Sequence, residues 1–373
     1  MNDFIYQAQS PRVVFGAGSL QHLEREIDLL GVRRALVLCT PQQAGAAQAG
    51  AAQAVVDRLG PRAAGLYAQA VMHVPIETAR AARAEATRLQ ADCAIALGGG
   101  STIGLGKAIA LESGLPIVAI PTTYAGSEMT PIYGITEAGL KKTGRDPRVL
   151  PRTVIYDPEL SRSLPLALSA TSGMNAMAHA VEGLYASDSN PILDLMAEEG
   201  IRALATALPQ IREQPPHLAQ PNQPAPAGDA RAQALYGAWL CGSVLGQVSM
   251  ALHHKLCHTL GGSFNLPHAE THTVVLPHAL AFNLPQVPLA AQRIARALGL
   301  PQAGQAATGL YDLARSLGAP LSLRELGLQE RDLDRVCELA LTQQYPNPRP
   351  LEQAALRQLL QMAYEGTRPL AAD

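Results

Sequence analysis

Aromatic side chains are scarce in this sequence. Only 4% of its 373 residues are Phe, Trp or Tyr, and a single Trp occurs, whereas hydrophobic residues reach 47% and Ala and Leu dominate. Ala and Leu favour helices, and small side chains allow helices to pack closely. We therefore expect a largely helical or α/β chain rather than an all-β one, and its length suits two domains.

Several targeting and binding signals are also missing. The net charge is −2 with no basic block, which excludes nucleic acid as an expected partner. No run of about eighteen apolar residues occurs, so we expect no membrane helix and no membrane partner. The segment Met1–Tyr6 carries Asp3 and has no basic region before an apolar stretch, which argues against a signal peptide.

The cysteine pattern indicates a reducing compartment. The five cysteines are odd in number, scattered, and never form a C-x-x-C pair. Free, mostly buried thiols explain this usage better than a disulfide framework or a zinc site. We therefore expect a cytoplasmic protein.

The first part of the chain alternates short apolar runs with helical stretches. Continuous apolar runs are typical of strands buried on both faces of a parallel sheet. Strand, helix and strand in alternation favours a doubly wound α/β domain. The expected strands are Arg12–Phe15, Ala35–Cys39, Ala94–Leu97, Ile117–Ile120 and Thr153–Tyr156, with a helix over Glu77–Leu89.

After about Ser161 the strand signal fades, and we expect an all-helical domain. We place the boundary near residue 160, giving domains 1–160 and 161–373. The Pro- and Gln-rich segment Gln214–Gly228 is expected to be a surface connection between helices. The expected helices lie within Ser169–Ser187, Ile192–Leu208, Ala230–Leu260, Leu289–Leu298 and Gln353–Glu365.

Two polar turns follow expected strands. Leu97 is followed by Gly98-Gly99-Gly100-Ser101-Thr102, where glycines let the backbone approach a phosphate and the next helix offers free N–H groups. Ser101 is expected to cap that helix. The run is neither a strict G-x-G-x-x-G nor a Walker A loop, so a plain tight turn is the alternative. Pro121–Glu128 forms the second turn, and two such turns at one sheet edge favour a nucleotide site.

Histidines recur at helical spacing in the second half. Asn175 and His179 are four apart, as are His254 and His258, while His268 follows in a loop after Gly261-Gly262, where the helix should end. Such positions can converge on one point between helices, as in a buried metal or catalytic site. The alternative for any single histidine is a satisfied core or surface group, and His253, His272 and His278 are interpreted in that way.

These motifs together resemble the iron-type alcohol dehydrogenases over roughly residues 10–285. The resemblance implies an N-terminal Rossmann-like domain, a helical C-terminal domain, an active site in the cleft between them, a nicotinamide cofactor and a homodimer. The matching motifs are Gly98-Gly99-Gly100-Ser101 with Lys107, Pro121-Thr122-Thr123, Gly126–Thr130, Ser172-Gly173-Met174, His179, Glu182, His254, His258, Leu260-Gly261-Gly262, Asn265–His268 and Leu276-Pro277-His278. The candidate cofactor residues are Gly98, Gly99, Gly100, Ser101, Lys107, Thr122, Thr123, Ser127, Cys39 and Lys142.

In that family one Asp and three His hold a divalent metal. The matching positions here are Asn175, His179, His254 and His268. Because an amide is a poorer ligand than a carboxylate, we expect no tightly bound metal.

Asn175 and Gly104 depart from the general family pattern, and both departures are similar to the maleylacetate reductases of this superfamily. So are the strings Tyr124–Thr130 and His253-His254-Lys255. The resemblance therefore implies that this chain shares their reaction.

That reaction is reduction of the carbon–carbon double bond of 2-maleylacetate to 3-oxoadipate, in the breakdown of aromatic compounds. Hydride addition leaves an enolate, which hydrogen-bond donors or a cation can stabilise. We expect His254 to be the principal donor, with His179 less important. The catalytic candidates are His254, His258, His179, His268 and Lys255, and the candidate cationic partners of the dicarboxylate are Lys141, Lys142, Arg145, Arg148 and Lys255.

The sequence alone leaves three alternative functions open. A metal-dependent alcohol or polyol dehydrogenase is the first alternative, a dehydroquinate synthase-like lyase the second, and a non-enzymatic nucleotide-binding module the third. The choice between NADH and NADPH is open too, because Gly65–Gln69 holds neither an acidic residue nor an Arg.

Overall fold

The computed structural model describes two compact units. One unit comprises Gln9–Leu164 and His217–Leu235, and the other comprises Met1–Ala8, Pro165–Pro216 and Tyr236–Asp373. The division into domains 1–160 and 161–373 stays a prediction, and the expected connection over 214–228 lies outside the described residues. The described residues are 3–8, 10–45, 49–137, 140–213, 229–342 and 345–371.

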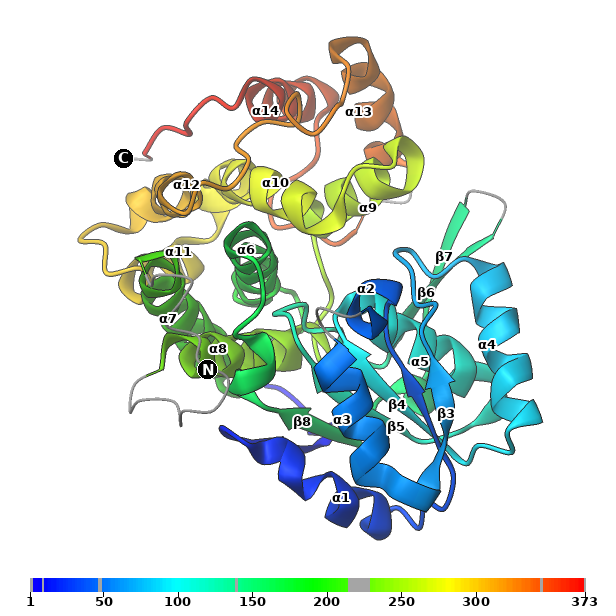
Figure 1. Ribbon diagram of the computed structural model, residues 1–373. Helices are drawn as coiled ribbons and strands as arrows, with labels where there is room; N and C mark the ends of the chain where they lie inside the picture. Colours follow the sequence, from blue (N-terminus) through cyan, green and yellow to red (C-terminus); the bar gives the residue numbers. More distant parts are fainter. Residues whose placement is uncertain are drawn as a thin grey trace. The chain divides into compact units, whose positions relative to one another are not determined.

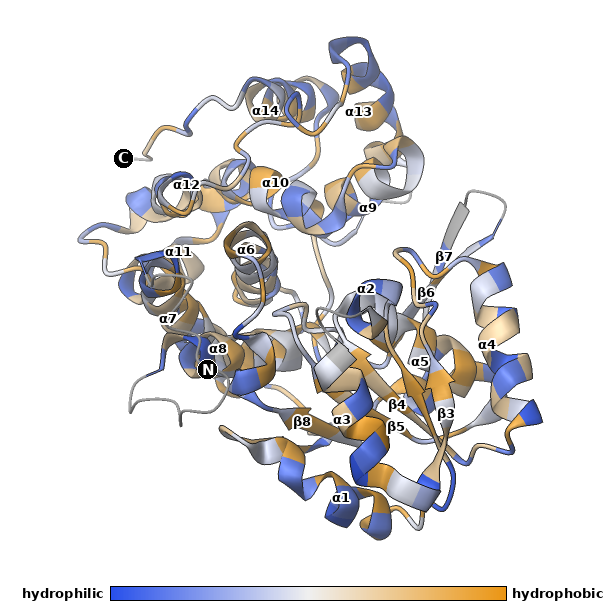
Figure 2. Ribbon diagram, in the orientation of Figure 1, coloured by the Kyte–Doolittle hydropathy of each residue, from blue (hydrophilic) through white to orange (hydrophobic). Residues whose placement is uncertain are grey.

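The first unit contains a six-stranded parallel sheet in the order β1-β8-β5-β4-β2-β3 (Figure 1). The four central strands β8, β5, β4 and β2 are buried along their whole length and are strongly hydrophobic (Figure 2). The parallel sheet expected from the apolar runs is therefore confirmed. Its strands are β1 (Arg12–Phe15), β2 (Ala35–Leu38), β3 (Ala63–Tyr67), β4 (Cys93–Gly98), β5 (Ile117–Pro121) and β8 (Thr153–Tyr156).

Helices cover both faces of this sheet. Alternate residues of one strand point to opposite faces, so Val37 of β2 packs in a core with α1 and α3, while Leu36 and Leu38 pack in a core with α4 and α5. This is the doubly wound arrangement that the sequence predicts. The helices of this unit are α1 (Leu23–Leu29), α2 (Pro41–Ala44), α3 (Ala49–Leu59), α4 (Ile76–Arg88) and α5 (Gly100–Ser113).

The strand order reverses between β2 and β4. From β2 the chain runs outward to the edge strand β3 and then returns past β2 to β4. Ligands of open α/β sheets bind at such a switch point, outside the carboxyl ends of the strands. The carboxyl ends here are Thr40 after β2 and Gly98 at the end of β4.

Two strand regions escaped the sequence analysis. β3 reads AAGLY, which is too poor in β-branched residues to stand out. β6 (Ile132–Glu137) and β7 (Leu140–Arg145) form an antiparallel hairpin in which Ile135 pairs with Lys142. The basic run that begins at Lys141 therefore starts in a strand.

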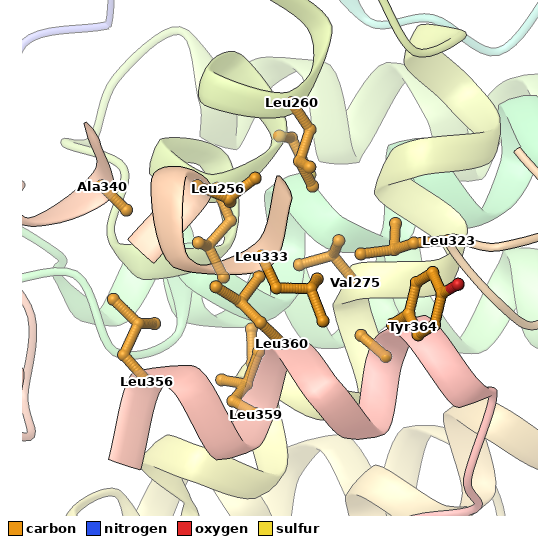
Figure 3. Close-up of a cluster of buried hydrophobic side chains, with 14 of the residues drawn as sticks. Leu256, Leu260, Val275, Leu323, Leu333, Ala340, Leu356, Leu359, Leu360 and Tyr364 are labelled. Carbon is orange, nitrogen blue, oxygen red and sulfur yellow. The ribbon is translucent and has the colours of Figure 1, made fainter. Parts of the chain in front are cut away.

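The second unit is helical, as predicted. α6 is buried continuously from Ser169 to Gly183, and α9, α10, α13 and α14 enclose a leucine-rich core (Figure 3). Among the described residues no helix has the length and hydropathy to cross a membrane. The helices are α6 (Leu166–Gly183), α7 (Pro191–Glu213), α8 (Ala230–Leu245, shared with the first unit), α9 (Leu252–Phe264), α10 (His268–Asn283), α11 (Pro288–Ala297), α12 (Ala306–Ser316), α13 (Leu333–Leu341) and α14 (Gln353–Glu365).

Two glycines set the approach of α7 and α8. A Cβ on Gly200 of α7 would lie 2.7 Å from Cys241 Sγ, and a Cβ on Gly237 of α8 would lie 3.0 Å from the Gly200 carbonyl oxygen. Only glycine allows this approach of α7 and α8. The expectation of small side chains at helix contacts is therefore confirmed.

The stretch Ala230–Leu260, expected as one helical region, is two helices separated at residues 246–251. Carboxylates explain the break, because Asp188 accepts the backbone N–H of Ser249 and Glu182 accepts that of Ala251. These bonds replace those that a continuous helix would make.

Two helix boundaries near the histidines also differ from the expectation. α9 continues through Gly261-Gly262 to Phe264 and ends on Asn265 in a left-handed conformation, which Asn tolerates. His268 is the first residue of α10 rather than part of a loop. The predicted loop histidine is therefore a helix residue.

Candidate active site

The two predicted polar turns meet at the carboxyl edge of the sheet. The backbone N–H of Thr122 donates to the Gly98 carbonyl at 3.1 Å, which ties the turn after β5 to the turn after β4. Thr123 lies against Gly99, where an added Cβ would come within 2.9 Å of its side chain. The predicted residues Gly98, Gly99, Thr122 and Thr123 are thus brought together.

Helix α5 begins at Gly100 with Gly99 as its N-cap, and no side chain caps it. The expectation that Ser101 caps this helix is therefore wrong, because Ser101 already lies in the first turn. The N–H groups of this first turn and the positive end of the helix dipole remain suited to an anion.

The sequence analysis missed two polar residues beside these turns. Thr40 and Gln43 form a capping box on the short helix α2, and Gln43 Nε2 donates to Thr122 Oγ1 at 3.3 Å. The signal was the string Thr40-Pro41-Gln42-Gln43 directly after a buried strand, with Pro at N1 and Gln at N3. Thr40 and Gln43 therefore join the candidate cofactor residues at the switch point.

Lys107 was predicted as a cofactor residue, but its ammonium has hydrogen-bond partners within the protein. Its buried ammonium donates to the carbonyl oxygen and hydroxyl of Thr130 and to the Ile132 carbonyl, at 2.7–2.9 Å. An ammonium has three N–H groups, so this arrangement leaves none for a phosphate and favours a structural role. Burial lowers the pKa of Lys107 and raises that of the buried Glu128, and the attraction between the two charges opposes both shifts.

The three further cofactor candidates occupy different places in this unit. Cys39 follows β2, but its thiol is buried in the core with α1 and α3, and burial raises its pKa. Lys142 is exposed on the hairpin and pairs with Glu137 at 2.7 Å. Ser127 begins the 3-10 helix that follows the second turn. All five cysteines are free and buried, as expected.

In the helical unit, α6, α9 and α10 bring six histidines together. His179 comes from α6 and His268 from the start of α10, and neighbouring ring centroids in the set lie 4.2–6.1 Å apart. The members are His179, His253, His254, His258, His268 and His272. The histidine pairs that were predicted to converge therefore lie close together in this unit.

A hydrogen-bonded chain links Glu182, His254 and His179. Glu182 Oε2 lies 2.6 Å from His254 Nδ1, and His254 Nε2 lies 2.9 Å from His179 Nδ1. If the carboxylate is ionised it accepts the Nδ1 proton, which leaves His254 Nε2 as the acceptor from His179 Nδ1. Both nitrogens of His254 are thus engaged inside the protein, which was not expected for a residue predicted as the principal donor to substrate.

Glu182 also holds the start of α9. It accepts the backbone N–H of Ala251 at 3.0 Å and that of His253 at 2.7 Å. Ala251, the N-cap of α9, has no side-chain acceptor of its own, so the buried carboxylate takes that role and lies at the positive end of the helix dipole. Burial raises the pKa of Glu182, and these N–H groups act against that shift.

His253 and His272 were interpreted as ordinary core or surface histidines, yet both lie inside the cluster. His253 Nε2 is 3.0 Å from the His272 carbonyl, and neither ring nitrogen of the buried His272 has a hydrogen-bond partner among the described residues. Burial lowers the pKa of His253 to about 3 and that of His272 well below its usual value. The missed signal was a third pair at four-residue spacing, His268 and His272.

Lys255 and His258 lie toward the more exposed side of α9. His258 Nδ1 is 3.0 Å from the hydroxyl of Tyr345, and Lys255 Nζ lies 5.7 Å from the centroid of the Tyr345 ring. Burial lowers the pKa of Lys255. Tyr345 was not predicted, and nothing in its sequence context marks it, because it lies between α13 and α14, just before a Pro-rich stretch.

The family's metal positions carry a weaker donor set here, because a neutral amide stands at the carboxylate position. Asn175 is a neutral amide whose buried Oδ1 has no hydrogen-bond partner among the described residues. The lone pair of His254 Nε2 faces His179 Nδ1. Three imidazoles and one amide carry no negative charge to offset a divalent cation.

Two other buried groups have metal-ligand atoms within 4.8 Å of one another. These are His253, Cys257 and His272, and Glu182, His253 and His254. Most of these atoms already have partners, since His253 Nε2 bonds to a carbonyl and the Glu182 oxygens accept backbone N–H groups. Neither group therefore resembles a vacant ligand set.

The chain is similar to known proteins of one family along most of its length. The family model for iron-containing alcohol dehydrogenase matches residues 10–158, and the model for the C-terminal part of the Fe-containing alcohol dehydrogenase family matches residues 169–364. The maleylacetate reductase of Burkholderia cepacia is 60% identical over 369 residues, covering 99% of this chain and all of that protein.

Solved structures of related proteins agree with this family assignment. Maleylacetate reductase from Agrobacterium tumefaciens is 52% identical with a TM-score of 0.90, and covers 99% of this chain and all of its own. Sulfoacetaldehyde reductase from Bifidobacterium kashiwanohense, solved in complex with NAD+, is only 21% identical with a TM-score of 0.85, covers 97% of this chain and 99% of its own, and shows the shared fold alone. The chain therefore belongs to the iron-containing alcohol dehydrogenase family, and within it groups with the maleylacetate reductases.

Proposed function

We propose that the protein reduces the carbon–carbon double bond of 2-maleylacetate to 3-oxoadipate, with NADH or NADPH as hydride donor. The relatives that carry this name match the chain from end to end at 51–60% identity. Hydride adds to the alkene carbon far from the ketone and gives an enolate, which is protonated at the neighbouring carbon. The nicotinamide loses a hydride, and the substrate gains that hydride and one proton.

The cofactor pyrophosphate would lie over Gly99, Gly100 and Ser101 at the start of α5, with Thr122 and Thr123 beside it. The support is the uncapped helix N-terminus and the absence of side chains on the glycines, so that backbone N–H groups can reach an anion. Thr40 and Gln43 add polar groups at the same switch point. The choice between NADH and NADPH stays open.

The histidine cluster would stabilise the enolate and supply its proton. The observation that carries this proposal is the buried chain Glu182–His254–His179 beside the neutral Asn175. With Glu182 protonated, a state that its raised pKa favours, each imidazole donates outward and His179 Nε2 carries the proton for the enolate carbon. That proton is then replaced through His254 from the Glu182 carboxyl, which becomes a carboxylate. In this account His254 acts with His179 as one unit rather than as a lone donor.

No step in this mechanism is assigned to a metal. The enolate oxygen needs hydrogen-bond donors or a positive charge, and the imidazoles of the Glu182–His254–His179 chain are candidates for that role. The argument against a tightly bound ion is the donor set, in which Asn175 stands at the family's carboxylate position. We further propose that the protein acts as a cytoplasmic homodimer, which light scattering of the purified protein can test for assembly.

The test is the change in absorbance at 340 nm with purified protein. We expect maleylacetate to oxidise NADH or NADPH, with little turnover of simple alcohols or polyols with NAD+. Metal-stimulated oxidation of alcohols without reduction of maleylacetate would instead support the alcohol dehydrogenase alternative. Conversion of a dehydroquinate synthase substrate with no net change at 340 nm would support the lyase alternative.

A further inference from the structure

Lys255 is a cation without an acidic partner among the described residues. By contrast, Lys107 has three acceptors and Lys142 pairs with Glu137. Lys255 is only partly exposed, and its ammonium lies 5.7 Å from the centroid of the Tyr345 ring. Removing a charge from water costs free energy unless a partner compensates. A half-buried ammonium on the helix that carries His254 and His258 therefore suits an anionic group of a ligand.

Tyr345 and His258 add a hydrogen-bond donor beside that charge. The phenol and a neutral imidazole hold two protons, and only one of them lies between the hydroxyl and His258 Nδ1, which are 3.0 Å apart. If His258 Nδ1 carries the imidazole proton, it donates to the hydroxyl, and the O–H of Tyr345 can then be donated to a third group. Burial and the negative charge of Glu182 raise the pKa of Tyr345, so its hydroxyl keeps its proton.

The segment that carries Tyr345 is anchored to two helices. Asn347 and Asn283 exchange two amide hydrogen bonds of 2.8 and 2.9 Å, and Asn283 is fully buried near the end of α10. The backbone N–H of Leu252, at the start of α9, also donates to Asn347 at 3.4 Å. Arg349 donates to the Phe282 carbonyl at 3.1 Å. Tyr345 is therefore held in place rather than carried by a loose loop.

We propose that Lys255, His258 and Tyr345 form a subsite that binds one carboxylate of the dicarboxylate substrate. This inference rests on the proposed function. The ammonium supplies the charge, and the Tyr345–His258 pair supplies a charge-assisted hydrogen bond. His254 lies one helical turn before His258, with ring centroids 6.0 Å apart, so the subsite holds the carboxylate beside the histidine chain.

Steady-state kinetics of Lys255→Met and Tyr345→Phe test the subsite. Each variant should raise the KM for maleylacetate by about 10- to 100-fold, because each loses one interaction with a charged group. The KM for the reduced nicotinamide should stay within about twofold of wild type. The matched controls are Arg324→Met and Tyr364→Phe, the same substitutions at a second cation–ring pair of 4.8 Å in this unit, and they should leave both KM values unchanged.

Binding of adipate, an unreactive dicarboxylate, separates this inference from the reaction itself. Calorimetry should show wild-type protein binding adipate and both variants binding it at least tenfold more weakly. That result would support the subsite even if maleylacetate proved not to be reduced. A fall in kcat with KM and adipate affinity unchanged would overturn the subsite and make Tyr345 a positioning residue for His258, and wild-type kinetics in both variants would overturn it as well.

Discussion

The carboxyl edge of the sheet and the histidine cluster are built by different means. At the sheet edge, backbone atoms set the geometry, with Gly99 packed on Thr123 and a helix that starts without a side-chain cap. In the cluster, side chains bond to side chains from helices α6 and α9, with Glu182 joining His254 and the start of α9. A site made of backbone tolerates few additions, whereas a site made of side chains fails when one partner is removed.

This difference also explains which features could be predicted from the sequence. Apolar runs and glycines are local signals, so four central strands and the glycine turn were found close to their true bounds. The hydrogen-bond partner of His254 is not a local signal, because Glu182 lies 72 positions away in the chain. The break before α9 and the place of Tyr345 depend on such distant contacts and could not be predicted.

The four-residue spacing of residue pairs predicted the histidine cluster correctly wherever both members of a pair were recognised. Two pairs at four-residue spacing were recognised, and the third pair, His268 and His272, was divided between a loop and a presumed core residue. Lys107 is the opposite case, because the sequence places a charged residue near the glycine turn but does not reveal its hydrogen-bond partners. Its three acceptors belong to residues 130 and 132, whose proximity the local sequence does not reveal.

The largest expected effect breaks the histidine chain. His254→Ala and His179→Ala should each lower kcat by about 10²- to 10⁴-fold, with little effect on cofactor KM. The double variant should be no worse than the poorer single one, because the two rings act as a unit through their 2.9 Å contact. This replaces the expectation from sequence that His179 matters less.

His278→Phe is the control for those variants, since His278 is buried in α10 outside the histidine cluster. Circular dichroism establishes that all variants fold, and His278→Phe should retain wild-type kcat. Losses that multiply in the double variant would show that His254 and His179 act independently.

The next effect concerns stability in the sheet unit. Lys107→Met should lower the free energy of unfolding by about 3–5 kcal/mol, because it leaves three acceptors and the buried Glu128 without their cation. Urea unfolding measures this change. Lys142→Met removes an exposed pair and should change stability far less. Equal unfolding midpoints for Lys107→Met and wild type would contradict the structural role of Lys107.

A smaller effect tests the backbone-built edge. Gly99→Ala places a methyl group 2.9 Å from the Thr123 side chain, and the displaced turn should raise the cofactor KM by about tenfold. Gly104→Ala is the matched control on the same helix, because its methyl group would meet Val74 instead, at 2.8 Å. An unchanged cofactor KM in a folded Gly99→Ala protein would remove the turn from the cofactor site.

Activity after removal of metal tests the central claim most directly. The protein is treated exhaustively with a chelator, its iron and zinc are measured, and reduction of maleylacetate is followed at 340 nm. With Asn175 in place of a carboxylate and His254 bonded to His179, we predict no stoichiometric metal and an unchanged kcat. A tightly held ion at about one per chain, with activity lost on its removal and restored on its return, would contradict the account.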